Sequence, residues 1–422
     1  MKMNFQPLST PVPNRKSGQR DVLQLATEPL DKVRIGFVGL GYRGQSAVNR
    51  WQHIDGVEVV ALCDTDIDFV NRCASTVRHG DVSLFSGPDG YTRLCALPHL
   101  DIVYICTDWQ SHAEIALCAM EHGKHVAIEV PAALSLAEIW QLVDKAETSR
   151  RHCMMLENSV YDYFESAVLQ LYRCGAFGNI VHVEGGYAHT MTDQWTPWRM
   201  EYNRTHRGDV YPTHGLGPLC QLLDIHRADR LDYLVAMQSD AYTGNTAYQD
   251  IMGKPCEDFS NGDETTTLIR TLRGKTITLT HNVMNPRPYS RGYKVVGTQG
   301  YASKYPQPQL LLAAEGLRKL QLPLEHAGQV LPDDVADRLL SAHYPSYFCE
   351  QQALAHELDP RGGMSFFMDY RLAYCLQRGL PLDMDVYDMA EWCCVSELSA
   401  LSIAHGAAPV CVPDFTRGAA SV

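Results

Sequence analysis

The sequence lacks any apolar run long enough to cross a bilayer, any Cys-x-x-Cys pair and any excess of positive charge. A membrane-spanning helix needs about 20 consecutive apolar residues, and no such run occurs in the 422 residues. The 36 basic and 49 acidic residues give a formal charge of −13. This balance argues against an extended surface for nucleic acid or anionic lipid. We therefore expect neither a nucleic-acid nor a membrane partner.

The 14 cysteines are scattered, without the paired spacing of a disulfide framework or a zinc site. Cys106 and Cys118 lie in apolar runs, where a free thiol packs as a small hydrophobe. No cluster of carboxylates and histidines has metal-ligand spacing, so we predict no metal. Residues 1–32 are polar, without the apolar stretch of a secretory signal, and predict an N-terminal arm. These features favour a reducing, cytoplasmic location, or the periplasm if a signal has been removed.

The first apolar strand, "VRIGFV", runs into the glycine-rich stretch "GLGYRG" and then into a helical pattern. Gly39, Gly41 and Gly44 have the spacing of a dinucleotide-binding turn, in which the backbone approaches a pyrophosphate. The next strand, 57–64, ends in Asp64, roughly 20 residues beyond the last glycine, where an acid binds the adenosine ribose. An acid there repels a 2′-phosphate, so the sequence predicts NAD rather than NADP. Arg43, inside the loop, is placed to contact phosphate.

Strands and helices continue to alternate, which predicts an α/β domain with a doubly wound parallel sheet, a Rossmann domain, over residues 33–158. Ligands of such sheets bind beyond the carboxyl ends of the strands. The segment 107–112, Glu129 and Asn158 follow strands directly, so they are expected at the cofactor cleft. For Glu129 the alternative is a carboxylate that caps the following helix. The expected strands are 100–107, 125–131 and 153–158, and the expected helices are 111–123 and 135–150.

From residue 159 to 422 the pattern is that of an α+β domain with an open, mostly antiparallel sheet. Alternating strands are expected at 179–189, 265–274 and 275–284. Helices are expected at 213–225 and within 331–406.

Two stretches of this second domain carry candidate chemistry. In "RGDVYPTHGLGP" Tyr211 and His214 are three residues apart, and a phenol and an imidazole aimed at one point can serve as acid and base. The alternative is a capped helix start with His214 satisfied internally. In "WTPWR" two tryptophans precede Arg199, a grouping suited to stacking on a sugar and donating to its oxygens. The alternative is an ordinary aromatic surface loop, which could have the same sequence. No partner can be named for His206, His226 or His281, which we interpret as structural or surface groups.

With these residues in view, the sequence resembles the glucose–fructose oxidoreductase and inositol dehydrogenase superfamily. Within it, the resemblance is closest to the NAD-dependent α-N-acetylgalactosaminidases of glycoside hydrolase family 109. The stretches that carry it are "GLGYRG", "TDWQSH", "EVP", "MMLEN", "YPTHGLGP", "NPRPYSR" and "GLPLDMDVYDMAEW".

The resemblance implies site residues at matching positions. In the superfamily the first domain usually ends in Glu-Lys-Pro, and the lysine assists hydride transfer; here Val130 replaces it, so Tyr211 and His214 are left to handle protons. The implied NAD site comprises Gly39, Gly41, Arg43, Gly44, Asp64, Trp109, Gln110, Ser111, His112, Glu129, Val130 and Asn158. The implied sugar site comprises Tyr161, Tyr187, Arg199, Tyr211, Pro212, Thr213, His214 and Tyr289.

The activity implied by the resemblance is cleavage of a small glycoside or glycan terminus with tightly bound NAD. Oxidation at C3 acidifies the C2 proton, elimination and water addition follow, and reduction restores the sugar, outside the two-carboxylate scheme of most glycosidases. An NAD-dependent sugar or cyclitol dehydrogenase, and a non-catalytic NAD-binding sensor, are the alternatives that one fold can also carry. A homo-oligomer is expected. Arg361 and Ser365 depart from the His and Asp that the resemblance leads us to expect, which leaves the preferred sugar open.

Overall fold

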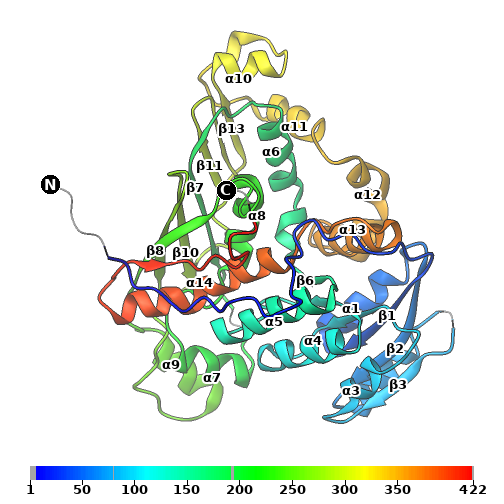
Figure 1. Cartoon of the computed structure of the whole chain (residues 1–422). Helices are drawn as coiled ribbons and strands as arrows, with labels where there is room; N and C mark the ends of the chain where they lie inside the picture. The colour runs from blue at the N-terminus through cyan, green and yellow to red at the C-terminus, as the bar shows by residue number, and fades with distance from the viewer. Residues whose placement is uncertain (1–5, 79, 192–193, 421–422) are drawn as a thin grey trace.

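A computed structural model describes residues 6–78, 80–191 and 194–420. The first of its two sheets has six strands in the order β3-β2-β1-β4-β5-β6, all paired in parallel (Figure 1). This confirms the predicted doubly wound parallel sheet. Its strands are β1 (Val33–Val38), β2 (Val57–Asp64), β3 (Ser83–Ser86), β4 (Ile102–Ile105), β5 (His125–Ile128) and β6 (Cys153–Met155).

The central strands of this sheet form because their residues are apolar on both faces. β4 and β5 are buried throughout, as expected for parallel strands with helices on either side. Local capping fixes where helices begin: the Ser135 side chain accepts from the backbone N–H of Glu138 and starts α5. The helices of this domain are α1 (Tyr42–Trp51), α2 (Ile67–Ala74), α3 (Gly90–Cys95), α4 (His112–Glu121) and α5 (Leu136–Ser149).

The second sheet has eight strands in the order β13-β12-β11-β7-β10-β9-β8-β14. Its pairings are antiparallel except for β7 with β10, which run parallel, so the predicted mostly antiparallel sheet is confirmed. Its strands are β7 (Ile180–Ala188), β8 (Leu231–Gln238), β9 (Thr265–Thr271), β10 (Thr276–Asn282), β11 (Lys294–Gly297), β12 (Gly300–Ser303), β13 (Gln309–Leu312) and β14 (Val410–Cys411).

Two helices, α8 (Thr213–Leu223) and α14 (Val386–Ala404), pack against this second sheet. The N-terminus of α8 lies directly on β7, because a Cβ on Gly215 would lie only 2.2 Å from the backbone nitrogen of Gly186. Glycine at 215 therefore lets the start of α8 approach the sheet. The other long helices of this region are α6 (Tyr163–Arg173), α7 (Pro197–Thr205), α9 (Gly244–Met252), α11 (Asp333–Ser341), α12 (Ser346–Leu358) and α13 (Met364–Arg378).

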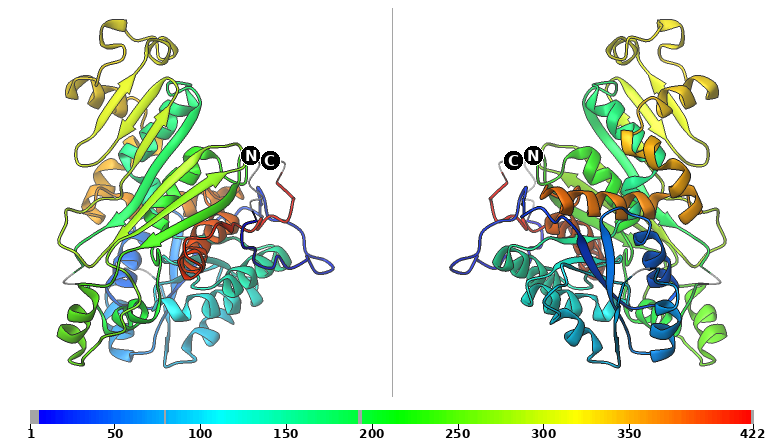
Figure 2. Two further views of the ribbon diagram at one scale, coloured as in Figure 1. Left: turned by 90° about the vertical axis from the view of Figure 1, so that its left-hand side faces the viewer. Right: turned by 90° about the vertical axis from the view of Figure 1, so that its right-hand side faces the viewer.

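The predicted N-terminal arm runs along the molecule and meets the other chain end, as Figure 2 shows. Leu8 forms a bridge with Val410 of β14. Farther along, the Arg15 guanidinium lies 2.9 Å from the buried carboxylate of Glu147 in α5, and the Val22 backbone N–H donates to the hydroxyl of Tyr387 in α14. The arm thus contacts both the first domain, at α5, and the second domain, at β14 and α14.

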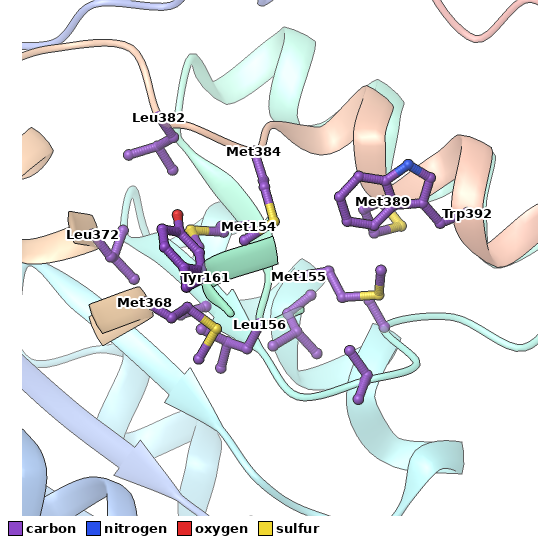
Figure 3. Close-up of a cluster of buried hydrophobic side chains, with 14 of the residues drawn as sticks. Met154, Met155, Leu156, Tyr161, Met368, Leu372, Leu382, Met384, Met389 and Trp392 are labelled. Carbon is purple, nitrogen blue, oxygen red and sulfur yellow. The ribbon is translucent and has the colours of Figure 1, made fainter. Parts of the chain in front are cut away.

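Between the two sheets the core is continuous and rich in methionine (Figure 3). Met154 and Met155 of β6 face Met384, which precedes α14, and Met389 and Trp392, which lie in the first half of α14 (Figure 3). Thioether side chains adapt to irregular gaps, which suits a junction between two differently twisted sheets. Among the residues described, no helix combines the length and the apolar character needed to span a bilayer.

Candidate active site

Two neighbouring cavities open where the sheets approach each other. The first, of about 940 Å³, lies over the carboxyl ends of β1, β2 and β4; we call it the glycine-loop cavity, after Gly39 and Gly41 in its wall. The second, of about 460 Å³, we call the tyrosine cavity, after Tyr187, Tyr211 and Tyr289. The two share wall residues from both domains: Arg43, Gln194, Trp195, Arg199 and Arg361.

The glycine loop has the geometry of a phosphate cradle. Gly39 has φ +90°, and a Cβ on Gly44 would lie 1.9 Å from the carbonyl oxygen of Gly39. A Cβ on Gly41, by contrast, would meet nothing within 4 Å. Gly41 also leaves the N-terminus of α1 without a side-chain cap, so the first N–H groups of the helix are open to an anion. These features fit the pyrophosphate of a dinucleotide.

Asp64 connects the end of β2 to the glycine loop. One carboxylate oxygen accepts from the Leu40 backbone N–H at 2.6 Å, and the other accepts from the Asp66 backbone N–H at 3.0 Å. The side chain lines the glycine-loop cavity, where the fingerprint requires a ribose-binding acid. The residues present therefore fit NAD.

Other predicted cofactor residues divide between the two cavities. Ser111 lines the glycine-loop cavity, whereas Trp109 and Asn158 line the tyrosine cavity. The ring of His112 is buried between the carbonyl oxygens of Pro131, at 2.8 Å, and Thr107, at 3.1 Å. His112 therefore holds together the loops that carry Thr107 and Pro131. Contact with the cofactor is left to the residues next to it in the sequence.

Of the remaining predicted cofactor residues, Arg43 lines both cavities. The Glu129 carboxylate is the largest cause that raises the pKa of the Arg43 guanidinium, so the two charges lie close together at the junction of the cavities. Val130 is buried, with 5% of its surface exposed. Gln110 is exposed. An apolar side chain therefore occupies the position where the superfamily resemblance leads us to expect a lysine.

A chain of polar groups leads from the buried core to the tyrosine cavity. The Glu157 carboxylate has no exposed surface and lies 2.5 Å from Nδ1 of His214. Nε2 of the same ring lies 3.4 Å from the hydroxyl of Tyr211, and both rings line the cavity. Ser159 donates to Glu157 at 2.6 Å. Because Glu157 engages Nδ1, the ring is oriented with Nε2 toward the cavity.

The pKa values of Tyr211 and Glu157, the two acids of this chain, are shifted in opposite directions. Burial raises the pKa of the Tyr211 phenol well above its ordinary value, and the neighbouring Tyr187 and Glu157 raise it further. Burial alone would raise the pKa of the Glu157 carboxyl, but the charge and hydrogen bond of His214 outweigh it and the pKa is lowered. Tyr211 is therefore a neutral proton donor at neutral pH, beside an imidazole held by a carboxylate.

Aromatic rings form one wall of the tyrosine cavity. The Trp109 and Tyr211 rings stack at 5.6 Å with 21° between their planes. The Arg199 guanidinium lies over Trp109 at 5.8 Å and over Trp198 at 5.0 Å. The stretch "WTPWR" thus contributes to the cavity wall rather than to a remote surface loop, and a cation held on aromatic faces is suited to polar ligand groups.

Tyr161 lies elsewhere, which corrects the sugar-site assignment made from sequence. Its ring sits within the hydrophobic cluster of Figure 3, 3% exposed, and its hydroxyl donates to Asp383 at 3.1 Å. It lines a separate cavity with Arg371 and Asp383. Pro212 and Thr213 are likewise buried; they shape the start of α8 that carries His214.

Several residues of the tyrosine cavity were missed by sequence reasoning. Arg291, 3% exposed, lines it and donates to Asp162 and Glu165 at 2.7 Å each. His189 also lines it, 3.1 Å from the hydroxyl of Tyr187. The signal for His189 was present, because it lies two residues after Tyr187, at the position that shares a face with Tyr187 in extended backbone. No local signal pairs Arg291 with acids about 130 residues away.

His226, predicted to be structural or a surface group, belongs to a buried ion cluster. Its Nδ1 lies 2.9 Å from Glu391, and Asp385 and Asp388 are close by. Burial opposes protonation, but these acids outweigh it and raise the pKa of His226. Arg227 donates to both carboxylate oxygens of Asp388, at 3.1 and 2.7 Å. Paired in this way, the cluster is a network of ion pairs and a poor set of metal ligands.

Comparison with known families divides the chain at the same place as the sheets. Residues 33–157 match the oxidoreductase family with an NAD-binding Rossmann fold, and residues 161–421 match the C-terminal domain of glycosyl hydrolase 109.

Curated relatives extend the match over almost the whole chain. Glycosyl hydrolase family 109 protein 1 of Bacteroides fragilis (strain YCH46) is 50% identical over 427 residues, which cover 98% of this chain and 92% of the relative. The glycosyl hydrolase family 109 protein of Porphyromonas gingivalis is 49% identical, with 98% and 90% covered.

Solved structures with the same fold are much more distant in sequence. A levoglucosan dehydrogenase in complex with NADH and L-sorbose aligns with a TM-score of 0.69 at 16% identity, over 91% of this chain and all of the other. The myo-inositol 2-dehydrogenase of Lactobacillus plantarum aligns with a TM-score of 0.62 at 14% identity, over 90% of this chain and 100% of that one. At such identities the likeness concerns the fold.

Proposed function

The chain belongs to glycosyl hydrolase family 109 and is an NAD-dependent glycoside hydrolase, and we propose that it releases terminal N-acetylgalactosamine or a related hexose by oxidation, elimination, water addition and reduction. The observation that carries this proposal is the chain from Glu157 through His214 to Tyr211, which opens into a cavity adjoining the dinucleotide site. Val130, at the usual position of the lysine, cannot transfer a proton. Tyr211 and His214 supply an acid and a base instead.

The proposed roles follow from the chemistry of each group. When bound, NAD would accept hydride from C3 of the sugar and later return it, while the proton of the C3 hydroxyl would leave to solvent on oxidation and be taken back on reduction. Nε2 of His214 removes the C2 proton, which is acidic once C3 is a carbonyl. Tyr211, kept as a neutral phenol by burial, protonates the departing glycosidic oxygen. Both transfers reverse direction when water adds, as general acid–base groups do in a two-step reaction.

Glu157 is proposed as a positioning residue. Its carboxylate holds Nδ1 of His214 at 2.5 Å and is itself held by Ser159 at 2.6 Å. A buried carboxylate in this place fixes the ring and stabilises the imidazolium that forms when the C2 proton is taken, as the acid of a hydrolase triad does. Glu157 touches no substrate and acts through His214.

Unpartnered polar atoms support an acetamido group on the substrate. Among the described residues, Arg199 Nε, Asn203 Oδ1 and both ring nitrogens of His281 have no hydrogen-bond partner, and all three residues line the tyrosine cavity. Burial lowers the pKa of His281 to about 4, so its neutral ring has one donor and one acceptor. The carbonyl and N–H of an amide would offer these atoms an acceptor and a donor, which favours an acetamido group because a buried polar group left unpaired is costly.

The test of the function uses the purified protein without added cofactor. We expect it to release the aglycone from p-nitrophenyl α-N-acetylgalactosaminide while the absorbance of NADH stays constant over many turnovers. A sugar dehydrogenase would instead accumulate NADH and release no aglycone. A binding protein without catalytic activity would do neither, and either result would refute the proposal.

A further inference from the structure

Arg361 lies at the mouth shared by the two cavities, in the short loop between α12 and α13. The loop backbone is held in place by the Asp359 carboxylate, which accepts from the backbone N–H groups of Arg361, at 3.2 Å, and Ser365, at 2.7 Å. The Arg361 side chain itself is exposed. A fixed backbone therefore presents a free-standing guanidinium at the cavity entrance.

The Arg361 guanidinium is without a direct partner in the part of the chain that the structure describes. Its side chain makes no hydrogen bond or ion pair to any described residue. Arg291, deeper in the same cavity, shows the contrast, because Asp162 and Glu165 each lie 2.7 Å from its guanidinium. A guanidinium offers a planar fork of donors that matches carboxylate, sulfate or phosphate. The guanidinium donors of Arg361 have no acceptor among the described residues.

The Arg361 charge also reaches the groups on the sugar side of the mouth. After burial, the charge of Arg361 is the next cause that lowers the pKa of His189. Arg43 and Arg199 line the same cavity. In the described part of the chain, the wall of the tyrosine cavity thus carries four arginines, Arg43, Arg199, Arg291 and Arg361, against one acid, Asp162, on a chain whose formal charge is −13. Such local reversal of charge at a cleft attracts anions.

We propose that Arg361 forms an anion-binding subsite at the mouth of the tyrosine cavity, which binds a sulfate or carboxylate group carried by the glycan substrate. This inference rests on the proposed function, since it places the anion on the glycoside that enters this cavity. The subsite would make the enzyme prefer acidic glycans to their neutral counterparts. The preference would weaken as salt screens the exposed pair.

The test compares p-nitrophenyl α-N-acetylgalactosaminide with its 6-O-sulfated form at low and high NaCl. We expect the ratio of kcat/KM, sulfated over neutral, to exceed one at low salt and to fall roughly tenfold in Arg361→Gln, a loss typical of a hydrogen bond to a charged group. Arg361→Glu should invert the preference. The matched control is Arg273→Gln, which removes the same charge in the β9–β10 turn, at the opposite end of the hairpin from His281.

A second measurement detects binding without turnover. Thermal unfolding with free N-acetylgalactosamine 6-sulfate should show a larger stabilisation than with N-acetylgalactosamine, and Arg361→Gln should remove the difference. Equal stabilisation by both sugars, or a sulfate preference that survives in Arg361→Gln, would overturn the subsite. Loss of bound NAD in Arg361→Gln with the preference intact would also overturn it, because Arg361 would then serve the cofactor diphosphate. If neither glycoside is cleaved but the sulfated sugar still stabilises through Arg361, the proposed function fails and the subsite stands.

Discussion

Nδ1 of His214 lies 2.5 Å from the carboxylate of Glu157, which has no exposed surface. The pair joins the end of β6 to the start of α8, two segments 57 residues apart in the sequence. It holds the imidazole with its other nitrogen toward Tyr211 and the tyrosine cavity. In the proposed mechanism, proton transfer at the sugar therefore depends on Glu157, which does not contact the sugar.

Changing Glu157 tests this positioning role. In Glu157→Gln the side chain can still accept from the ring, but the negative charge that stabilises the imidazolium is lost; in Glu157→Ala both are lost. We expect kcat to fall in both, more in the alanine variant and within the range of roughly 100- to 10,000-fold typical of acid–base groups. KM and bound NAD should change little. Equal kcat in the parent and both variants would show that Glu157 has only a structural role.

Removing the phenol of Tyr211 tests the proton donor. Tyr211→Phe keeps the stacking on Trp109 but cannot protonate a leaving oxygen. We expect kcat to fall by roughly 100-fold or more for an alkyl glycoside, and by much less for a nitrophenyl glycoside, whose leaving group needs no proton. The measurement is the ratio of the two losses. Equal losses for both substrates would assign Tyr211 a role other than protonation of the leaving group.

Asp64→Ala tests the dinucleotide site. The substitution removes the proposed acceptor for the ribose hydroxyls and the bond to the Leu40 backbone N–H. Each hydrogen bond to a charged acceptor is worth about 1.5–3 kcal/mol, so the variant should purify with little NAD. Denaturing the protein and assaying the released nicotinamide measures this. Full retention of NAD in the variant would place the ribose elsewhere.

Asp209 predicts a particular pH dependence of stability. Burial raises the pKa of its carboxyl from 3.8 to about 7, so folding holds a proton that the unfolded chain releases. The stabilisation is complete below pH 3.8 and is lost as the pH rises through 7, at no more than about 1.4 kcal/mol per pH unit. Asp209→Asn should therefore raise the Tm relative to the parent at pH 8 but not at pH 4. A difference independent of pH would contradict this assignment.

The parts of the molecule that local sequence specifies could be predicted from it. The glycine turn, Asp64 and the alternation of strands and helices follow from spacing and periodicity alone, and the structure has them at the predicted places. Strand β3 was missed because its four residues are mostly half-exposed and carry little pattern.

The site was harder to predict because its contacts span the chain. Tyr161 follows β6 as Asn158 does, yet its ring turns into the core, and position after a strand does not specify that direction. The sequence placed Glu157 at the end of a predicted strand, and only the structure shows its contact with His214 at the start of α8. Gly215 allows α8 to approach β7 closely. The sequence does not show which element a glycine in a helix packs against.

The central claim is that cleavage proceeds by proton removal at C2, and hydrolysis in heavy water tests it most directly. In the proposed mechanism the proton that His214 returns to C2 comes from solvent, so the sugar released in deuterium oxide should carry deuterium at C2, with no net accumulation of NADH. Mass spectrometry and proton NMR of the product measure this, and a conventional two-carboxylate glycosidase run in parallel is the control, since its reaction leaves C2 untouched. A product with ordinary hydrogen at C2 after complete cleavage would contradict the account, even if NAD is bound.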